Sequence, residues 1–282
     1  MNNTNIAVVT DSCADIPASV AAKMNIEVIP LQVIFGHDTY RDGIDIKSKG
    51  FFDMLSKAEK LPTTAHPSPK DFSKVYKRLL EKFDHVLSIH LSEKLSGTIK
   101  AAKIAAQEFK GRVFTWDTHA ISVGVGLQVC AAAQAVKEGK PLSEIRDLLS
   151  KIRETSTALF SVDTLEYLQK GGRIGKAASL LGTVLNIKPI IIVKEGYYHA
   201  FGKGRSRKKA VRKMLNHFIK VGRKNGVKRV TVGHGLAPEE AKMLADGLYE
   251  EFGVKPTFIS DIGPVIATHV GPGAVGAVIS SF

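Results

Sequence analysis

Short β-branched runs alternate with helical patterns through the first half of the chain, and this alternation restricts the fold more than any other feature. The runs are rich in Val, Ile and Thr, which favour strands, and the segments between them place apolar residues at helical spacing. The predicted strands are residues 6–10, 28–34, 85–91 and 112–116, and the predicted helices are one that Pro17 opens, 69–83, 98–109 and 122–138. Such an order predicts a mostly parallel sheet with helices on its faces.

The second half has a different pattern, in which some strands follow one another directly. Residues 188–193 and 197–201 form a predicted hairpin with Glu195 and Gly196 near its turn. The other predicted elements are a helix from Pro141 to near Glu154, helices over 206–221 and 238–252, and strands at 158–162, 229–232, 257–260 and 276–280. These mixed connections predict an α+β domain. We place the boundary near residue 155, which gives an N-terminal α/β domain over 1–155 and a C-terminal α+β domain over 156–282.

Length and composition agree with two cytoplasmic domains. At roughly 150 residues per domain, 282 residues predict about two domains, and 44% hydrophobic residues exclude a disordered chain. The longest charge-free apolar stretch, 120–136, has 17 residues and predicts a buried helix, because it is too short to span a bilayer. The N-terminus lacks the basic start of a secretory signal, and Cys13 and Cys130 belong to no CxxC pair. We therefore expect reduced thiols in a cytoplasmic protein.

Positive charge is concentrated in one segment of the chain. There are 40 Lys and Arg against 27 Asp and Glu, a formal net charge of +13. Residues 196–238 contain 12 of the basic residues and no acidic residue, so the rest of the chain is close to neutral. This basic segment either meets an anionic partner, such as a phosphate-handling protein or a nucleic acid, or is simply a solvated face.

Three short motifs place hydrogen-bond donors where an anion could bind. Ser96 and Gly97 precede a predicted helix, whose free N–H groups can bind an anion, although a serine there can also act only as a cap. The loop 62–69 holds Thr64 among prolines, and its hydroxyls either donate to a ligand or cap the next helix. His269 precedes a Gly-Pro-Gly turn, so it is expected at a strand end, either facing a ligand or as a structural histidine.

The sequence contains few of the motifs that identify enzymes. HExxH, Walker A and GxSxG patterns are absent, and the histidines and cysteines lack zinc-ligand spacing, so no metal site is predicted. Asp11 and Asp15 follow the first strand, where phosphotransferase carboxylates can lie, although helix capping and turn formation also account for them. Arg173 follows a diglycine turn and either holds an anion or closes the turn.

Taken in order, these motifs resemble the DegV family of bacterial fatty-acid-binding proteins. The resemblance extends over essentially the whole chain, and the ordered set is more specific than any single motif. The matching segments are Val9-Thr10-Asp11-Ser12, Asp15-Ile16-Pro17, residues 40–46, Pro67-Ser68-Pro69, Leu95-Ser96-Gly97-Thr98, residues 163–168, Gly171-Gly172-Arg173-Ile174, residues 187–190 and residues 269–273.

The resemblance implies a DegV-like two-domain fold in which a long-chain fatty acid lies in a tunnel between the domains. It also implies that the carboxylate is bound by Thr64, Ser96 with Gly97, and His269. Neutral donors suit this task, because they leave no buried positive charge when the site is empty. No cofactor and no metal are expected.

The acyl chain needs an apolar wall. Each buried methylene contributes about 0.8 kcal/mol, so a long chain can bind tightly with few polar contacts. We expect part of this wall from 120–136, where Gly124 and Gly126 leave room, and part from an apolar helix over 177–185.

Family members act as lipid carriers, so the resemblance implies a protein that is not itself an enzyme. Such a carrier presents the carboxylate to the catalytic subunit of a separate ATP-dependent fatty acid kinase. It then takes the acyl phosphate to phospholipid synthesis, with transient contact to a membrane or an acyltransferase. Arg205, Lys203 and Arg173 are expected to face the kinase.

Two alternatives from other functional classes remain. A nucleic-acid-binding regulator would use the basic segment 196–238, but no helix-turn-helix, RNA-binding motif or aromatic platform accompanies it, so no nucleic acid is expected. A stand-alone phosphotransferase or hydrolase would use Asp11, Asp15 and His269.

The chain also departs from the family pattern at a few positions. The family commonly reads Thr-Ser-Gln-Pro-Ser in the proline loop, where this chain has Ala65 and His66 after the threonine. Ile99 and Lys100 stand where Tyr-Gln usually follows the Ser-Gly-Thr motif, and Gly175 replaces a serine. These departures bear on the preferred acyl chain and on the partner surface.

Overall fold

Strand β1 (Ile6–Asp11) is buried on both faces and lies inside a four-stranded parallel sheet. In the computed structural model, which describes residues 5–182 and 187–282, Ile6 and Val8 point to one apolar core and Ala7 and Val9 to another. Such two-sided burial is typical of parallel strands. The order is β2 (Ile26–Ile29), β1, β6 (His85–His90) and β7 (Val113–Asp117), which confirms the predicted parallel sheet.

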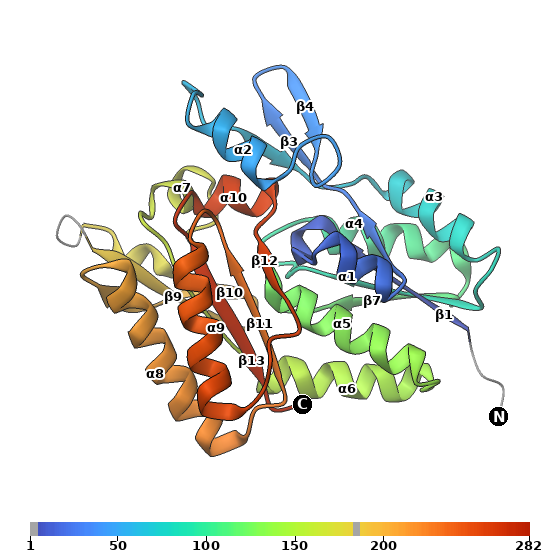
Figure 1. The fold of residues 1–282 in the computed structure, drawn as a ribbon. Coiled ribbons are helices and arrows are strands. Elements are labelled where there is room, and N and C mark those ends of the chain that lie inside the picture. The colour runs from blue at the N-terminus through green and yellow to red at the C-terminus, as the bar shows by residue number, and fades with distance from the viewer. Residues whose placement is uncertain (1–4, 183–186) are drawn as a thin grey trace.

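Helices cover both faces of this sheet (Figure 1). α3 (Pro69–Leu79) and α4 (Thr98–Ala106) pack on one face around Phe72 and Tyr76, and α1 (Ala18–Lys23) lies beside β2. α5 (Val123–Lys137) packs against β1 and β6 on the other face and also contacts β11 and β13 of a second sheet. Because α5 is shared by two sheets, most of its residues are buried. α6 (Leu142–Thr155) packs beside it.

The second sheet has six strands in the order β10-β9-β8-β13-β11-β12, and neighbours are antiparallel except β11 and β12. The strands are β8 (Thr157–Ser161), β9 (Lys188–Lys194), β10 (Tyr197–Gly204), β11 (Arg229–His234), β12 (Ile259–Asp261) and β13 (Val275–Ser280). α8 (Arg207–Asn225) and α9 (Pro238–Phe252) cover its outer face (Figure 1). The mixed sheet confirms the predicted α+β character of the second half.

The predicted strand 28–34 divides into two strands that belong to different sheets. Pro30 follows β2 and offers no N–H for further pairing, and the Leu31 N–H donates to Ser12 Oγ. The chain then enters a small three-stranded sheet, which forms the upper part of Figure 1 together with α2. Its elements are β3 (Gln32–Phe35), β4 (Asp38–Arg41), β5 (Thr63–Ala65) and α2 (Ser48–Leu55). This sheet carries Thr64 on β5.

Other predicted elements differ in extent or kind. His269 lies in a helix, α10 (Pro264–Val270), rather than at a strand end, because Pro264 opens a helical turn that continues to Gly271. The described part of the predicted helix 177–185 is a short 3-10 helix, η3 (Ala177–Leu180), and residues 183–186 lie outside the described residues. Predicted helix 69–83 ends at Leu79, whereas predicted helix 206–221 continues to Asn225. The remaining short helices are η1 (Ser12–Ala14), η2 (Gln107–Phe109) and α7 (Glu166–Lys170).

The strands fall into two groups along the chain. Every strand of the parallel sheet precedes residue 155, and every strand of the six-stranded sheet follows it. Two domains that meet at this residue stay a prediction. Over residues 5–182 and 187–282, no helix is both long enough and apolar enough to cross a membrane.

Close packing of α5 gives a first testable prediction. A Cβ on Gly126 would lie 2.6 Å from the Ala14 carbonyl oxygen and 2.7 Å from Phe258 Cζ. We expect Gly126→Ala to lower the free energy of unfolding by about 1–3 kcal/mol, because the added methyl group overpacks the contact between η1 and α5. Urea denaturation followed by circular dichroism measures this change.

Gly50 in α2 provides the matched control, since the nearest atom to a Cβ there is 3.9 Å away. Gly50→Ala should leave stability unchanged or raise it slightly. Equal denaturation midpoints for Gly126→Ala and the unmodified chain would contradict this prediction, because they would show that α5 can shift away from η1 without loss of stability.

Candidate functional site

Residues from separate segments of the chain line one cavity of about 60 Å³, which we call the polar cavity. Thr64 comes from β5, Ser96 and Gly97 from the turn before α4, and His269 from α10. The structure thus brings together all four residues that the sequence suggests for carboxylate binding. Most of the remaining wall is apolar and includes Leu31, Leu91, Leu95, Val265 and Ile266.

Thr64 and His269, which both line the polar cavity, contact each other. Thr64 Oγ1 lies 3.0 Å from His269 Nε2. Burial, with a smaller contribution from the nearby Arg173 charge, lowers the pKa of His269 to about 4, so its imidazole is neutral at pH 7. His269 Nδ1 has no hydrogen-bond partner among the described residues and packs on Gly171, where a Cβ would be 2.5 Å away. Glycine at 171 therefore makes room for this ring.

Ser96 and Gly97 lead into the first turn of α4. Ser96 Oγ accepts a hydrogen bond from the Thr98 N–H at 3.3 Å and lies 2.8 Å from Thr98 Oγ1. The first N–H groups of a helix have no partner within the helix, so this turn supplies donors without adding a full charge. A Cβ on Gly97 would lie 2.7 Å from His66 Nε2, and the missing side chain lets His66 cover the turn.

Asp15 joins α10 to the start of α5. Its carboxylate accepts hydrogen bonds from the Gly263 N–H at 2.7 Å and from the Ser122 hydroxyl at 2.5 Å. Gly263 caps α10, which carries His269, and Ser122 caps α5. Burial raises the pKa of Asp15 well above its usual range. Asp15 therefore has a positioning role, which is one of the two interpretations that the sequence leaves open.

Asp42 supports the same end of α10 from the small sheet. Its carboxyl group lies beside Ser12 and Val265, but its Oδ2 has no hydrogen-bond partner among the described residues, and burial raises its pKa to about 7. A Cβ on Gly263 would lie 2.9 Å from one oxygen of Asp42 and 3.1 Å from one oxygen of Asp15. Asp42 is not among the site residues that the sequence predicts, although it lies in the segment 40–46 that resembles the family, and this is the signal that could have identified it.

Asp11 belongs to a buried chain of hydrogen bonds. Its Oδ2 lies 2.7 Å from His90 Nδ1, His90 Nε2 lies 2.6 Å from Ser88 Oγ, and Ser88 accepts from the Tyr76 hydroxyl. The order Asp, His, Ser is that of a hydrolase triad, but all four side chains lie at 0% exposure. A substrate has no access to Ser88 in this arrangement. The placement supports a structural role for Asp11, which also accepts from the Cys13 N–H.

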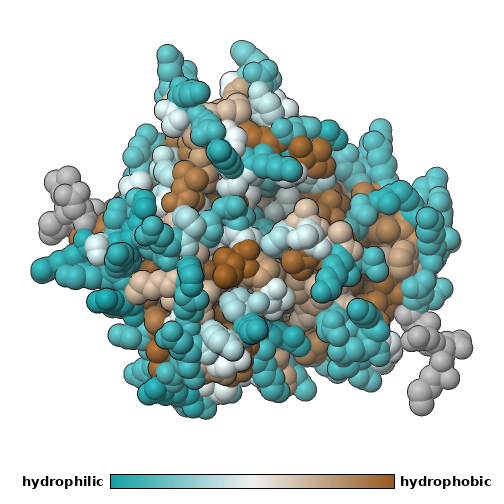
Figure 2. Space-filling model, viewed as in Figure 1, coloured by the Kyte–Doolittle hydropathy of each residue, from teal (hydrophilic) through white to brown (hydrophobic). Residues whose placement is uncertain are grey.

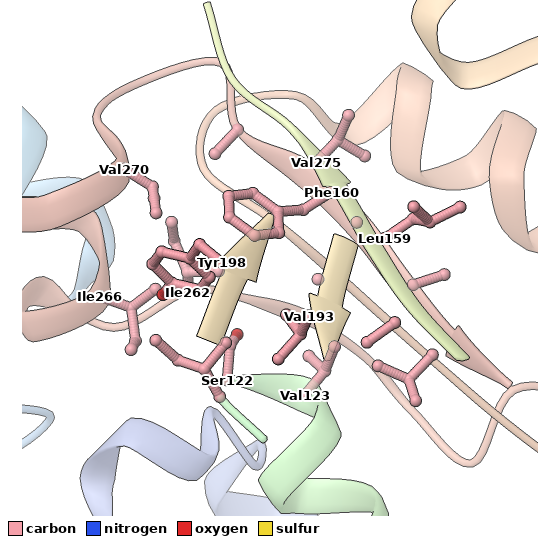
Figure 3. Close-up of a pocket in the computed structure, with 17 residues that line it drawn as sticks. Ser122, Val123, Leu159, Phe160, Val193, Tyr198, Ile262, Ile266, Val270 and Val275 are labelled. Atoms are coloured by element: carbon pink, nitrogen blue, oxygen red, sulfur yellow. The ribbon is translucent and has the colours of Figure 1, made fainter. Parts of the chain in front are cut away.

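A second cavity of about 60 Å³ adjoins the first and is almost entirely apolar, so we call it the apolar cavity (Figure 3). Side chains from α10, the start of α5 and the six-stranded sheet converge on it, and those labelled in Figure 3 include Val123, Phe160 and Val270. Three residues line both cavities: Ile121, Tyr198 and Ile266.

The expected wall from residues 120–136 is only partly correct. Ile121, Ser122 and Val123 line the apolar cavity, but Gly124 and Gly126 do not. Protein atoms occupy the space beside both glycines, because Val278 packs against Gly124, and Ala14 and Phe258 pack against Gly126. These glycines serve helix packing instead of leaving room for a ligand.

Some cations of the basic segment are already paired. Arg207 donates two hydrogen bonds to the Asp163 carboxylate, at 2.8 and 2.6 Å, and Lys188 Nζ lies 3.0 Å from the same group. Arg223 pairs with Glu251. These residues stabilise α8 against its neighbours, so they contribute less to a free basic surface than the sequence suggests.

The three cations predicted for partner contact lie in two places. Arg205 and Lys203 are exposed before α8, and neither forms an ion pair within residues 5–182 and 187–282. Figure 2 shows that the side of the molecule that carries α8 in Figure 1 is predominantly hydrophilic. Arg173 is exposed at the wall of the polar cavity, where its Nη1 donates to the Gly171 carbonyl at 2.7 Å.

Comparison with known proteins agrees with this architecture. A family model described as "Uncharacterised protein, DegV family" matches residues 5–281. A DegV domain-containing protein of Deinococcus radiodurans is 36% identical over 275 residues, which cover 98% of each chain. A DegV family protein of Thermus thermophilus, described as fatty acid binding, superimposes with a TM-score of 0.93 at 39% identity over 99% of this chain and 100% of that one. A stearic-acid-binding protein of Eubacterium ventriosum has a TM-score of 0.89 at 26% identity, with 98% of each chain covered.

The buried carboxylate of Asp42 predicts how stability depends on pH. Its pKa is about 7 in the folded protein and about 3.9 in an unfolded chain, so between these values only the folded state holds the proton. Stability should therefore fall as pH rises from 4 to 7, by up to about 1.4 kcal/mol per pH unit from this group. Asp42→Asn should remove the contribution of Asp42 to this dependence of unfolding free energy on pH and leave the contribution of Asp15. Urea denaturation at several pH values measures both.

Asp45→Asn is the control, because Asp45 is exposed and Arg41 lowers its pKa to about 2, below the tested window. The slope between pH 4 and 7 should stay unchanged in this variant. If the slope of Asp42→Asn also equals that of the unmodified chain, Asp42 does not hold the proton.

Proposed function

Because the chain belongs to the DegV family, we propose that it binds one long-chain fatty acid, with the carboxylate in the polar cavity and the acyl chain in the apolar cavity. The observation that carries this proposal is the shared wall of Ile121, Tyr198 and Ile266 between the two cavities. A ligand with one polar end and a long apolar tail suits such a pair. Fatty acid binding in the Thermus thermophilus and Eubacterium ventriosum proteins supports the same choice.

In this proposal, the carboxylate is held by convergent neutral donors. The hydroxyls of Thr64 and Ser96, a backbone N–H at the start of α4 after Gly97, and the His269 ring are the available groups. A carboxylate has about four acceptor positions, and each hydrogen bond to a charged group contributes about 1.5–3 kcal/mol. Because His269 is neutral, the empty cavity holds no buried cation there.

The acyl chain would be bound by apolar burial, at about 0.8 kcal/mol for each methylene. An acyl chain whose head group lies in the polar cavity reaches the apolar cavity only past the wall that the two cavities share. The two cavities must therefore join when the lipid enters. Ile121, Tyr198 and Ile266 are the side chains that have to move.

We further propose that the protein is a cytoplasmic carrier that catalyses no reaction itself. It presents the carboxylate to the catalytic subunit of a separate ATP-dependent fatty acid kinase and carries the acyl phosphate to phospholipid synthesis, with transient contact to a membrane or an acyltransferase. Exposed Arg205 and Lys203, which form no ion pair within the described ranges, support a docking surface for a phosphate-handling partner. Arg173, at the wall of the polar cavity, supports contact with a head group that acquires negative charge.

Replacement of Thr64 tests the carboxylate site. We expect Thr64→Val to weaken the binding of oleate by about 10–100-fold, since it removes one hydrogen bond to a charged group. Isothermal titration calorimetry with delipidated protein measures the change. Thr63→Val is the matched control, because Thr63 is the preceding residue of β5, is exposed and points to the opposite face of the strand. Equal losses in the two variants, or no loss in Thr64→Val, would contradict the assignment.

Replacement of Arg205 tests the partner surface. Arg205→Ala should bind oleate as the unmodified chain does, yet support less turnover by a fatty acid kinase, because a cation that attracts the partner is gone. Acyl phosphate formation in a reconstituted assay measures this. Lys224→Ala is the control, since Lys224 is also exposed but lies near the other end of α8, about 26 Å along the helix from Arg207. Full turnover with Arg205→Ala would show that this residue is only a solvated side chain.

A further inference from the structure

His66 stands at the mouth of the polar cavity and is the one exposed imidazole there. Its ring lines the cavity together with Thr64, Ser96 and His269, and its Nε2 packs against Gly97. A head group bound to the hydroxyls and to the start of α4 would therefore lie beside this ring. His66 is also one of the positions where the chain departs from the family pattern, so its role is a property of this chain.

The contact of His66 with Pro67 determines which ring nitrogen carries the hydrogen when the imidazole is neutral. Nδ1 lies 2.9 Å from the Pro67 carbonyl oxygen. A carbonyl oxygen only accepts hydrogen bonds, so Nδ1 must be the donor. In the neutral ring Nε2 then carries a lone pair and no hydrogen. A carboxylate cannot form a hydrogen bond with this unprotonated Nε2, because both groups are acceptors. The imidazolium, in contrast, offers an Nε2–H donor and a positive charge.

On the basis of the proposed function, we propose that His66 is a further head-group residue, which binds the carboxylate as an imidazolium through Nε2–H, so that each fatty acid anion binds together with one proton. The proton comes from solvent, which the exposed ring reaches directly, and returns to solvent when the ligand leaves. No covalent bond forms or breaks in the ligand.

The other ionisable groups that line the cavity do not compete for this proton near pH 7. His269 on α10 stays neutral, because burial lowers its pKa to about 4. Burial raises the pKa of Cys13 on η1 and of Tyr198 on β10, so both also stay neutral. Arg173, also in the wall, is always charged and takes up no further proton. Imidazole is the side chain that changes charge between pH 5 and 8.

This assignment has consequences for ligand preference. Affinity for a fatty acid anion should rise as pH falls from 8 to 6, by up to about tenfold per pH unit when one proton is taken up. A head group with more negative charge, such as an acyl phosphate, should gain more from the imidazolium than a carboxylate does. A fatty alcohol of the same length carries no charge, so its binding should involve no proton.

Calorimetry in buffers of different ionisation enthalpy counts the protons taken up on binding. Delipidated protein is titrated at pH 7 with oleate, and separately with oleyl alcohol, in phosphate and in Tris. The unmodified chain should take up a measurable fraction of one proton with oleate and none with oleyl alcohol. His66→Gln, which keeps a polar side chain of similar size, should still bind oleate but take up no proton, and its affinity should not change between pH 6 and 8.

Proton uptake that is equal in His66→Gln and the unmodified chain would overturn the proposal, since the proton would then belong to the ligand or to another group. Oleate binding without proton uptake in the unmodified chain would also overturn it, while the proposed function would stand. If neither protein binds oleate, the proposed function fails and this inference fails with it.

Discussion

The contacts of two buried carboxyl groups with the first turn of α10 are the interactions on which the site depends most. Asp15 and Asp42 come from different parts of the N-terminal half, and both meet α10 around Gly263. α10 carries Ile266, which lines both cavities, and His269, which faces Thr64. A shift of this helix would therefore change the polar cavity, the apolar cavity and the wall between them together.

Charge is arranged so that the interior of the site stays neutral and cations stay at the surface. His269 is neutral and the other interior donors are hydroxyls and backbone groups, so the empty cavity does not bear the cost of an unpaired buried cation. Arg173 and His66 stand at the mouth, where water solvates them. The basic residues of the segment 196–238 lie mostly on and just before α8, none of them lines either cavity, and some are paired, as Arg207 is with Asp163. This division suits a protein that holds a lipid inside and meets a partner outside.

The sequence predicts the parallel sheet and most helices correctly, because periodic apolar patterns and β-branched runs indicate local structure directly. The ordered family motifs identify Thr64, Ser96 and His269 as candidate carboxylate-binding residues. The spacing of these residues in the sequence does not by itself indicate that they share one site. Local patterns failed where distant contacts decide the structure. Pro30 separates two strands whose pairing partners lie elsewhere in the chain. His269 lies on a seven-residue helix, but the Gly-Pro-Gly sequence that follows it indicates a turn. Asp42 received no role because its partners on α10 are more than 200 residues away.

We propose that this chain carries a fatty acid at the point where Ile121, Tyr198 and Ile266 separate a polar cavity from an apolar one. Mass spectrometry of lipid extracted from the purified protein tests this most directly. We expect one long-chain fatty acid per chain, which is replaced by another long-chain acid added in excess. An extract without fatty acid, from a protein that also fails to take one up on addition, would contradict it.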